Sequence, residues 1–279
     1  AKRDLYRRIE SLRKDEAIVS SNTSTILRHV LKADLGSRFA GNFAISHFFN
    51  PPRHMRLLEI VTGEDTKPEV AQRMREAGEV VLGKTAVDCR DTPGFIANRL
   101  GCYWMSVATL EALACGLTPE EADAVAGPPF GFPLTGIFGL LDLVGIDLIP
   151  DVWTSLCQAL PAQDPFQSYD LPGNGVIRDM IAAGRIGRKS GGGFYRQHGV
   201  GPEKTLEVFD YENNCYRPLK ALKGAGELPA LCGQRDAAGR YAWRVLSRLV
   251  SYAAQVAPEI ADDVATIDTA MKLGYAWKD

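Results

Sequence analysis

The chain has 279 residues, enough for two domains at roughly 100 to 200 residues each. Hydrophobic residues make up 46% and charged residues 24%, which is ordinary for a folded globular protein and excludes a disordered, collagen-like or coiled-coil chain. The 32 lysines and arginines nearly balance the 34 aspartates and glutamates, without long runs of one sign. This balance favours neither a nucleic-acid partner nor a membrane surface.

Two further patterns exclude particular classes of protein. The longest uncharged run, residues 124–141, is interrupted by Pro128, Pro129, Pro133 and several glycines, so we expect no membrane-spanning helix. The six cysteines are scattered, without a C-x-x-C pair or a histidine at ligand spacing. We therefore expect neither a metal site nor a disulfide framework, and a reducing cytoplasm fits this usage.

The first 90 residues alternate between helix and strand patterns. Leu5, Ile9 and Leu12 recur at helical spacing, which predicts an amphipathic helix over residues 1–16 with these side chains buried. The patterns that follow predict strands at 17–20, 41–49, 57–61 and 84–89, and helices at 25–35 and 67–82. This alternation indicates the half of a doubly wound sheet that lies past its midpoint.

The character of the chain changes after Asp91. Pro93-Gly94 breaks the preceding element, and residues 95–115 form a long apolar stretch with helical spacing. We predict a helical second domain that contains a glycine- and proline-rich loop at 127–136 and ends near residue 195. An irregular linker with one hairpin is expected after it, and a new helical stretch begins near residue 237.

A weak internal repeat connects the two helical parts. A shift of 145 positions aligns Arg99 with Arg244 and Asp123 with Asp268, although chance would also explain so few identities. If the repeat is real, Trp243 replaces Asn98 and packs in a core against the helix at 95–117.

A literal G-x-x-x-x-G-K-[ST] pattern, Gly78 to Thr85, has the wrong context for a phosphate loop. A phosphate loop follows a strand and opens a helix, whereas here a charged helix precedes the pattern and a strand-like run follows it.

His47 and Glu59 are the candidate chemical pair. His47 ends one predicted strand and Glu59 lies in the next, so adjacent strands can bring the imidazole and the carboxylate together. Such a pair sets the tautomer and raises the basicity of a general base. A histidine at a strand end is nevertheless more often structural, and this alternative stays open on the residues alone.

Five ordered motifs resemble the 3-hydroxyacyl-CoA dehydrogenase family over residues 1–197. They are Ser21-Asn22-Thr23-Ser24, His47-Phe48-Phe49-Asn50-Pro51, Glu59, Asp91-Thr92-Pro93-Gly94-Phe95-Ile96-Ala97-Asn98-Arg99, and Lys189-Ser190-Gly191-Gly192-Gly193-Phe194-Tyr195. The resemblance implies NAD-dependent oxidation of a (3S)-3-hydroxyacyl-CoA to a 3-oxoacyl-CoA in fatty-acid β-oxidation, with NAD as cofactor and an acyl-CoA as substrate.

The resemblance also assigns roles to residues. His47 would be the general base, and Glu59 would orient it. Ser24 and Asn98 would bind the reacting oxygen or the thioester region, while Ser24, Asn50 and Lys189 would reach the cofactor. Without the resemblance, Ser24 and Asn50 are turn residues, Asn98 is a helix cap and Lys189 is a solvated side chain.

The implied fold class is α/β followed by α. Residues 1–90 would be the C-terminal half of a Rossmann-type NAD-binding domain, residues 91–198 an all-α dehydrogenase C-terminal domain, residues 199–236 a linker, and residues 237–279 the start of a second, degenerate helical copy. The two helical copies would form an intramolecular pseudo-dimer.

Two departures from the family pattern are visible. The G-x-G-x-x-G fingerprint is absent, so we expect this chain to be part of a longer polypeptide and inactive by itself. The segment between Pro133 and Asp142 is one residue longer than in single-function members, and with residues 268–277 it resembles multifunctional members that carry an enoyl-CoA hydratase domain, expected beyond residue 279. The alternatives are an inactive structural or interaction module and another hydroxy-acid dehydrogenase with a similar helical domain.

Overall fold

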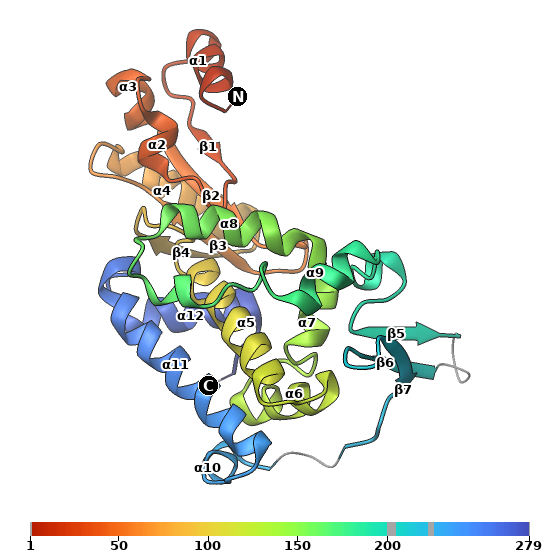
Figure 1. Ribbon diagram of the computed structural model, residues 1–279. Coiled ribbons are helices and arrows are strands. Elements are labelled where there is room, and N and C mark those ends of the chain that lie inside the picture. The colour runs from red at the N-terminus through yellow and green to blue at the C-terminus, as the bar shows by residue number, and fades with distance from the viewer. Residues whose placement is uncertain (1, 200–204, 223–225, 279) are drawn as a thin grey trace. The chain divides into compact units, whose positions relative to one another are not determined.

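The computed structural model describes residues 2–199, 205–222 and 226–278, so parts of the expected linker and both chain ends lie outside the described residues. The chain divides into two compact units (Figure 1). The first comprises Ala1–Arg99 with Ala254–Ala276, and the second comprises Leu100–Ala253 with Trp277–Asp279. Residues 237–279 are thus shared between the units. Within the described ranges, no helix is long and apolar enough to cross a membrane.

The first unit contains a four-stranded sheet in the order β1-β2-β3-β4. These strands are β1 (Val19–Ser21), β2 (Phe43–Phe48), β3 (Leu57–Val61) and β4 (Thr85–Cys89), which confirms the predicted strand positions. β1 runs parallel to β2 and β3 parallel to β4, but β2 and β3 are antiparallel. The antiparallel step follows from the connection, because residues 49–56 are too few for the crossover that parallel strands need.

Helices of the first unit pack around this sheet. They are α1 (Lys2–Leu12), α2 (Arg28–Lys32), α3 (Gly36–Gly41), α4 (Pro68–Glu76) with its π-helical continuation η1 (Ala77–Val81), the first residues of α5 (Ala97–Ala114), the end of α11 (Ala237–Ile260), and α12 (Val264–Tyr275). α12 contacts β3 and β4. The C-terminal stretch therefore belongs structurally to the unit that holds the sheet.

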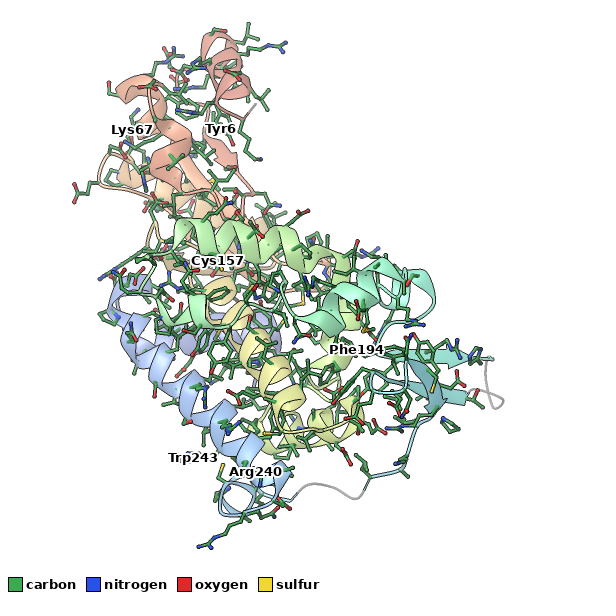
Figure 2. The ribbon with its side chains drawn as sticks, in the orientation of Figure 1. Tyr6, Lys67, Cys157, Phe194, Arg240 and Trp243 are labelled. Atoms are coloured by element: carbon green, nitrogen blue, oxygen red, sulfur yellow. The ribbon has the colours of Figure 1, made fainter. Side chains whose placement is uncertain are left out.

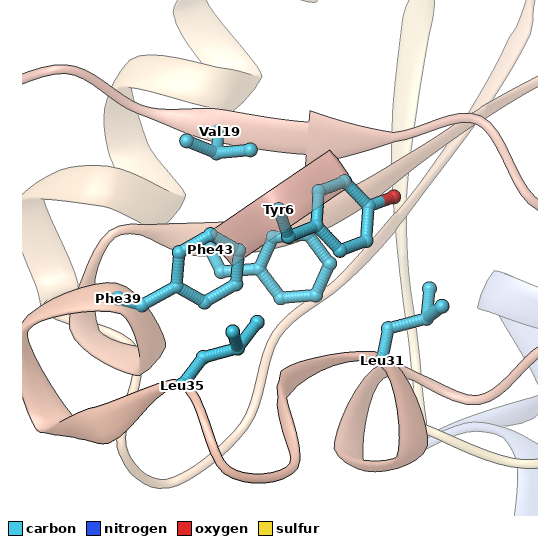
Figure 3. Close-up of a cluster of buried hydrophobic side chains, with 6 residues drawn as sticks. All are labelled: Tyr6, Val19, Leu31, Leu35, Phe39 and Phe43. Carbon is cyan, nitrogen blue, oxygen red and sulfur yellow. The ribbon is translucent and has the colours of Figure 1, made fainter. Parts of the chain in front are cut away.

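The buried face of α1 differs from the predicted one. Leu5 and Leu12 are exposed, and Tyr6 is the buried residue of this helix. The ring of Tyr6 lies 5.7 Å from Phe39 and 5.3 Å from Phe43 (centroid distances), in a cluster completed by Val19, Leu31 and Leu35 (Figure 3). Tyr6 has two aromatic partners in this cluster, and Ile9 of the predicted face packs against the same cluster, so the inward face of α1 is centred on these two residues.

The second unit is mainly helical but also contains a small sheet. Its elements are most of α5, α6 (Pro119–Val125), η2 (Pro128–Phe130), α7 (Phe138–Val144), η3 (Ile146–Leu148), α8 (Ile149–Ala159), η4 (Pro165–Ser168), α9 (Gly175–Ala182), η5 (Arg188–Ser190), β5 (Tyr195–His198), β6 (Thr205–Asp210), β7 (Cys215–Pro218), α10 (Leu228–Cys232) and most of α11. The strands pair antiparallel in the order β5-β6-β7. The expected hairpin is β6–β7, and its pairing with β5 corrects the expectation of an all-α domain.

Two enclosed aspartates explain the glycine-rich motif before β5. Asp123 accepts hydrogen bonds from the N–H groups of Phe138 and Gly139, at 2.8 and 3.1 Å, and from the Tyr195 hydroxyl at 2.7 Å. Asp142 accepts from the backbone N–H groups of Phe194 and Tyr195, at 2.8 and 2.7 Å. A Cβ at Gly193 would stand 2.0 Å from an Asp142 carboxylate oxygen, so this turn requires glycine. Phe194, labelled in Figure 2, is fully buried beside it.

α11 packs on α5 within the second unit, but not through Trp243. Trp243 is 57% exposed (Figure 2), which contradicts its predicted core role. Tyr241 and Tyr252 are buried instead, and the Tyr252 ring stacks on Tyr103 at 3.9 Å. Trp243 lies two residues after Tyr241, about 200° around the helix, and therefore faces away from the core.

Because Tyr252 is buried and Trp243 exposed, replacing each by alanine should change stability by different amounts. Tyr252→Ala should lower the free energy of unfolding by about 3–5 kcal/mol, since it deletes a buried stacked ring. Its hydroxyl also donates to Asp164 at 3.0 Å. Trp243→Ala should change the free energy of unfolding by less than about 0.5 kcal/mol. Urea unfolding of both variants checks this, and a larger effect for Trp243→Ala would contradict the placement.

The enclosed aspartates predict that stability falls as the pH rises. Burial outweighs their donors and raises the pKa of Asp123 to about 7 and that of Asp142 to about 6. The unfolded chain loses these protons near pH 4, whereas the folded chain keeps them, so stability is lost between about pH 4 and 7. Asp123→Asn should flatten the decline of urea midpoints with pH. Asp179→Asn, at an exposed position, should leave it unchanged.

Candidate active site

His47 and Glu59 lie opposite each other on the antiparallel strands β2 and β3. His47 Nδ1 is 2.6 Å from Glu59 Oε2, and both side chains are buried, that of Glu59 completely. Directly opposed residues of an antiparallel pair are near neighbours on one face of the sheet. The strand pairing therefore creates the contact that the sequence spacing suggested.

Glu59 also holds the start of helix α5. Its Oε1 accepts hydrogen bonds from the backbone N–H groups of Ile96 and Ala97, at 3.1 and 2.9 Å. The first N–H groups of a helix lack partners within the helix and carry partial positive charge. Glu59 is thus a helix cap supplied by another element, and the helix end fixes the position of the carboxylate that His47 contacts.

The turn before α5 orients these N–H groups toward Glu59. Gly94 and Phe95 both have positive φ, 77° and 51°. This backbone conformation is easy for glycine but costs energy for an aromatic residue, so surrounding contacts must maintain it at Phe95. The Phe95 ring is completely buried, with its centroid 5.7 Å from that of His47.

One ring nitrogen of His47 remains open for chemistry. Because Glu59 engages Nδ1, Nε2 is the atom that can exchange a proton, and within the described residues no side chain or backbone group bonds to it. The Phe49 ring lies 4.9 Å from the imidazole (centroid distance) and, with Phe95, encloses it in apolar surroundings. Such an enclosed His–carboxylate pair fits a general base.

Cys89 is a neighbour of Glu59 that the sequence did not single out. Burial, and then the charge of Glu59, raises the pKa of the Cys89 thiol well above its usual value. Cys89 consequently stays a neutral thiol beside the carboxylate. Its position on β4, next to β3 in the sheet, becomes apparent only from the strand pairing.

Within the described residues, the other expected site residues of the first unit have no hydrogen bond to the His47–Glu59 pair. Asn98 follows Ala97 in the first turn of α5 and so lies next to the N–H groups that bind Glu59. Ser24 is half-buried and Asn50 exposed in the first unit, and no hydrogen bond joins either to the His47–Glu59 pair. Lys189 belongs to the second unit, where its ammonium donates to Asp147 at 2.7 Å.

The loop after β1 is fastened to the end of β2. The Asn22 side-chain oxygen accepts from the Phe48 N–H at 2.8 Å. The Ser21–Ser24 loop and the His47 segment therefore lie side by side at one edge of the sheet. Asp91 adds a second support, since its carboxylate accepts from the N–H groups of Arg28 and His29 that open α2. Partners more than 60 residues apart leave no local sequence signal.

The residues of the phosphate-loop-like pattern, Gly78 to Thr85, make structural contacts. Lys84 donates to the Met55 carbonyl at 2.7 Å, and a Cβ at Gly78 would stand 2.5 Å from the Leu58 side chain. Among the residues that the structure describes, no cluster of side chains is suited to hold a metal ion.

The double role of Glu59 predicts a stability effect. Glu59→Gln removes a negative charge that has three hydrogen-bond partners. It also replaces one carboxylate oxygen by an NH₂ group, which cannot accept a hydrogen bond from His47 or from the N–H groups of α5. The free energy of unfolding should fall by about 1–3 kcal/mol, in the range for a buried charged hydrogen bond. Guanidinium unfolding checks this, with the exposed Glu64→Gln as control. An unshifted midpoint for Glu59→Gln would be inconsistent with the capping role.

Two family models match consecutive parts of the chain. The 3-hydroxyacyl-CoA dehydrogenase NAD-binding domain matches residues 1–92, and the C-terminal domain of the same family matches residues 94–197. A trifunctional enzyme assigned to the fatty acid oxidation complex of Rickettsia prowazekii is 36% identical over 99% of this chain and 38% of its own length. A protein assigned as a 3-hydroxyacyl-CoA dehydrogenase in Bacillus subtilis is 35% identical over 99% of this chain and 36% of its own length.

Solved structures share the fold. The 3-hydroxybutyryl-CoA dehydrogenase of Escherichia coli superposes with a TM-score of 0.71 at 22% identity, covering 99% of this chain and 70% of that one. FadB2 of Mycobacterium tuberculosis gives a TM-score of 0.59 at 28% identity, covering 70% of this chain and 66% of that one. The chain spans little more than a third of the length of the trifunctional relative. Both matched domains, in the order found here, place the chain in the 3-hydroxyacyl-CoA dehydrogenase family.

Proposed function

We propose that the protein containing this chain oxidises (3S)-3-hydroxyacyl-CoA to 3-oxoacyl-CoA with NAD. The observation that carries the proposal is the buried His47–Glu59 pair, 2.6 Å apart, with Nε2 of His47 left open. The match to the family's NAD-binding and C-terminal domains supports the same activity. The trifunctional relative of the fatty acid oxidation complex supports a role in β-oxidation.

In this proposal His47 moves one proton. Its Nε2 takes the proton of the substrate 3-hydroxyl, and the imidazolium that results remains paired with Glu59 through Nδ1. The N–H groups of Ile96 and Ala97 hold the Glu59 carboxylate in place beside the new positive charge. Bound NAD supplies the acceptor for the hydride that leaves C3.

The residues at the sheet edge fit the nicotinamide end of NAD and the reacting part of the substrate. The Ser21–Ser24 loop and the end of β2 meet there, and the buried Ser21 hydroxyl has no hydrogen-bond partner within the described part of the chain. We assign Ser24 and Asn98 to the reacting oxygen or thioester, and Ser24, Asn50 and Lys189 to the cofactor side. Lys189 would have to exchange Asp147 for the cofactor.

We also propose that α5 and α11 are two copies of one element that form a pseudo-dimer. The aligned residues Arg99 and Arg244 each pair with a glutamate near the end of the other helix. In the first unit Arg99 pairs with Glu259 near the end of α11, at 3.4 Å. In the second unit Arg244 pairs with Glu111 near the end of α5, at 3.1 Å. This reciprocity supports the repeat. The 145-residue shift, however, aligns Glu111 with Val256 and Glu259 with Ala114, and exposed Asp268 does not share the environment of Asp123.

The proposed role of His47 predicts a large loss of turnover. In the full-length protein, His47→Gln should lower kcat by about two to four orders of magnitude, the range for losing a general base. Reduction of acetoacetyl-CoA by NADH, followed by NADH absorbance, measures this. Unfolding midpoints show whether the variant remains folded.

His54→Gln is the matched control. His54 is exposed on the loop between β2 and β3, so its replacement should leave kcat unchanged. Turnover of His47→Gln close to that of the unmodified protein would remove His47 from the mechanism. An unmodified full-length protein without dehydrogenase activity would favour the alternative of a structural or interaction module.

A further inference from the structure

Gly274, in the last turn of α12, lies close to side chains of three other segments. A Cβ at this position would stand 2.9 Å from Leu57 Cδ2, and 3.4 Å from both Ala97 Cβ and Phe49 Cε1. Glycine inside a helix is less favourable than alanine by about 1 kcal/mol. The close approach of α12 accounts for the glycine, since a Cβ there would require either Leu57 or the helix to shift.

The three neighbours of Gly274 belong to the three segments that build the His47–Glu59 pair. Leu57 opens β3, two residues before Glu59. Ala97 opens α5 and donates its N–H to Glu59. Phe49 follows His47 by two residues, and its ring packs 4.9 Å from the imidazole. One position on α12 thus touches the strand, the helix end and the ring that together hold the pair.

The next residue extends this contact. The Tyr275 ring meets the Phe49 ring edge to face, with centroids 6.1 Å apart. The Phe49 ring consequently contacts both the imidazole and the end of α12. A displacement of α12 would therefore be transmitted to His47 through a single ring.

Polar contacts fix the segment that leads into α12. The Arg90 N–H donates to the Ile260 carbonyl at 3.2 Å, and the Arg90 guanidinium binds Asp262 at 2.8 Å and the Pro258 carbonyl. Arg90 directly follows β4, so the connection between α11 and α12 is tied to the sheet at the strand next to Glu59. Buried Ile267, Ala270 and Met271 line the inner face of α12.

We propose that the C-terminal end of α12, at Gly274 and Tyr275, is a positioning element of the active site. It holds Phe49, β3 and the start of α5 in the arrangement that aligns His47 with Glu59. The expected effect of α12 on catalysis rests on the proposed function. The placement of α12 against Phe49, β3 and α5 is independent of that function. Gly274 is a positioning residue, because it contacts neither member of the pair directly.

The test enlarges residue 274 in the full-length protein. Gly274→Ala should lower kcat about three- to tenfold and Gly274→Val about 10- to 100-fold, since small displacements of a catalytic group cost this much. KM should stay within about twofold, because the pair acts on the reaction more than on binding. Leu57→Val removes the atom nearest to the new Cβ, so kcat of the double variant Gly274→Ala/Leu57→Val should recover relative to Gly274→Ala.

A spectroscopic readout separates positioning from stability. The proton between His47 Nδ1 and Glu59 should give a far-downfield proton NMR signal that disappears in His47→Gln. Gly274→Ala should shift or broaden this signal. Gly175→Ala is the matched control, because Gly175 opens α9 and a Cβ there meets nothing within 4 Å.

Three results would overturn the proposal. They are unchanged kcat and proton signal in folded Gly274→Val, a loss confined to KM, and a lowered unfolding midpoint with unchanged kcat per folded molecule. If Gly274→Val does not fold, kcat and the proton signal of Gly274→Ala and of the double variant Gly274→Ala/Leu57→Val test the proposal instead. Absence of dehydrogenase activity in the unmodified protein would overturn the proposed function alone, and the proton signal would still test the placement of α12.

Discussion

The first unit depends on one buried carboxylate. Glu59 has no exposed surface, and an ionised carboxylate in such a place is costly unless donors surround it. Its donors come from different segments: the imidazole of His47 on β2, and the N–H groups of Ile96 and Ala97 at the start of α5. Satisfying this charge therefore fixes the register of β2 against β3 and the point at which α5 begins. The same contacts determine the tautomer of His47, so the structural and chemical roles of Glu59 are inseparable.

The sequence predicted the elements of this arrangement better than their partners. Strand positions and the His47–Glu59 pair followed from local patterns, because apolar strands end at polar residues and neighbouring strands in the chain tend to pair. The antiparallel step between β2 and β3 was missed, although the short connection contains the information. The capping of α5 by Glu59 and of α2 by Asp91 joins residues 37 to 63 positions apart, and local patterns carry no signal of such pairing.

The errors in the helical part have a common origin. Periodicity alone assigned Leu5 and Leu12 to a core, and the weak repeat assigned Trp243 to one, but all three are exposed. A helix buries the face on which its largest contacts converge, and Tyr6 and Tyr252 find aromatic partners that those residues lack. In the motif that contains Lys189, whose cofactor role stays a prediction, the structure shows that Gly193 leaves room for the Asp142 carboxylate. A motif can thus combine structural and functional residues that its sequence does not distinguish.

The placement of α12 bears on how a repeat can lose its original role. If residues 237–279 are the second helical copy that we propose, this copy is free to change wherever its residues do not meet substrate, as exposed Asp268 and Trp243 illustrate. Where the copy contacts the sheet it has less such freedom, because Gly274 lies against Leu57, Ala97 and Phe49, and a Cβ there would require a neighbour to shift. The segment that forms no site of its own would then be constrained by the site of the first unit. On this argument, degeneration of the repeat ends at the surface where α12 meets β3.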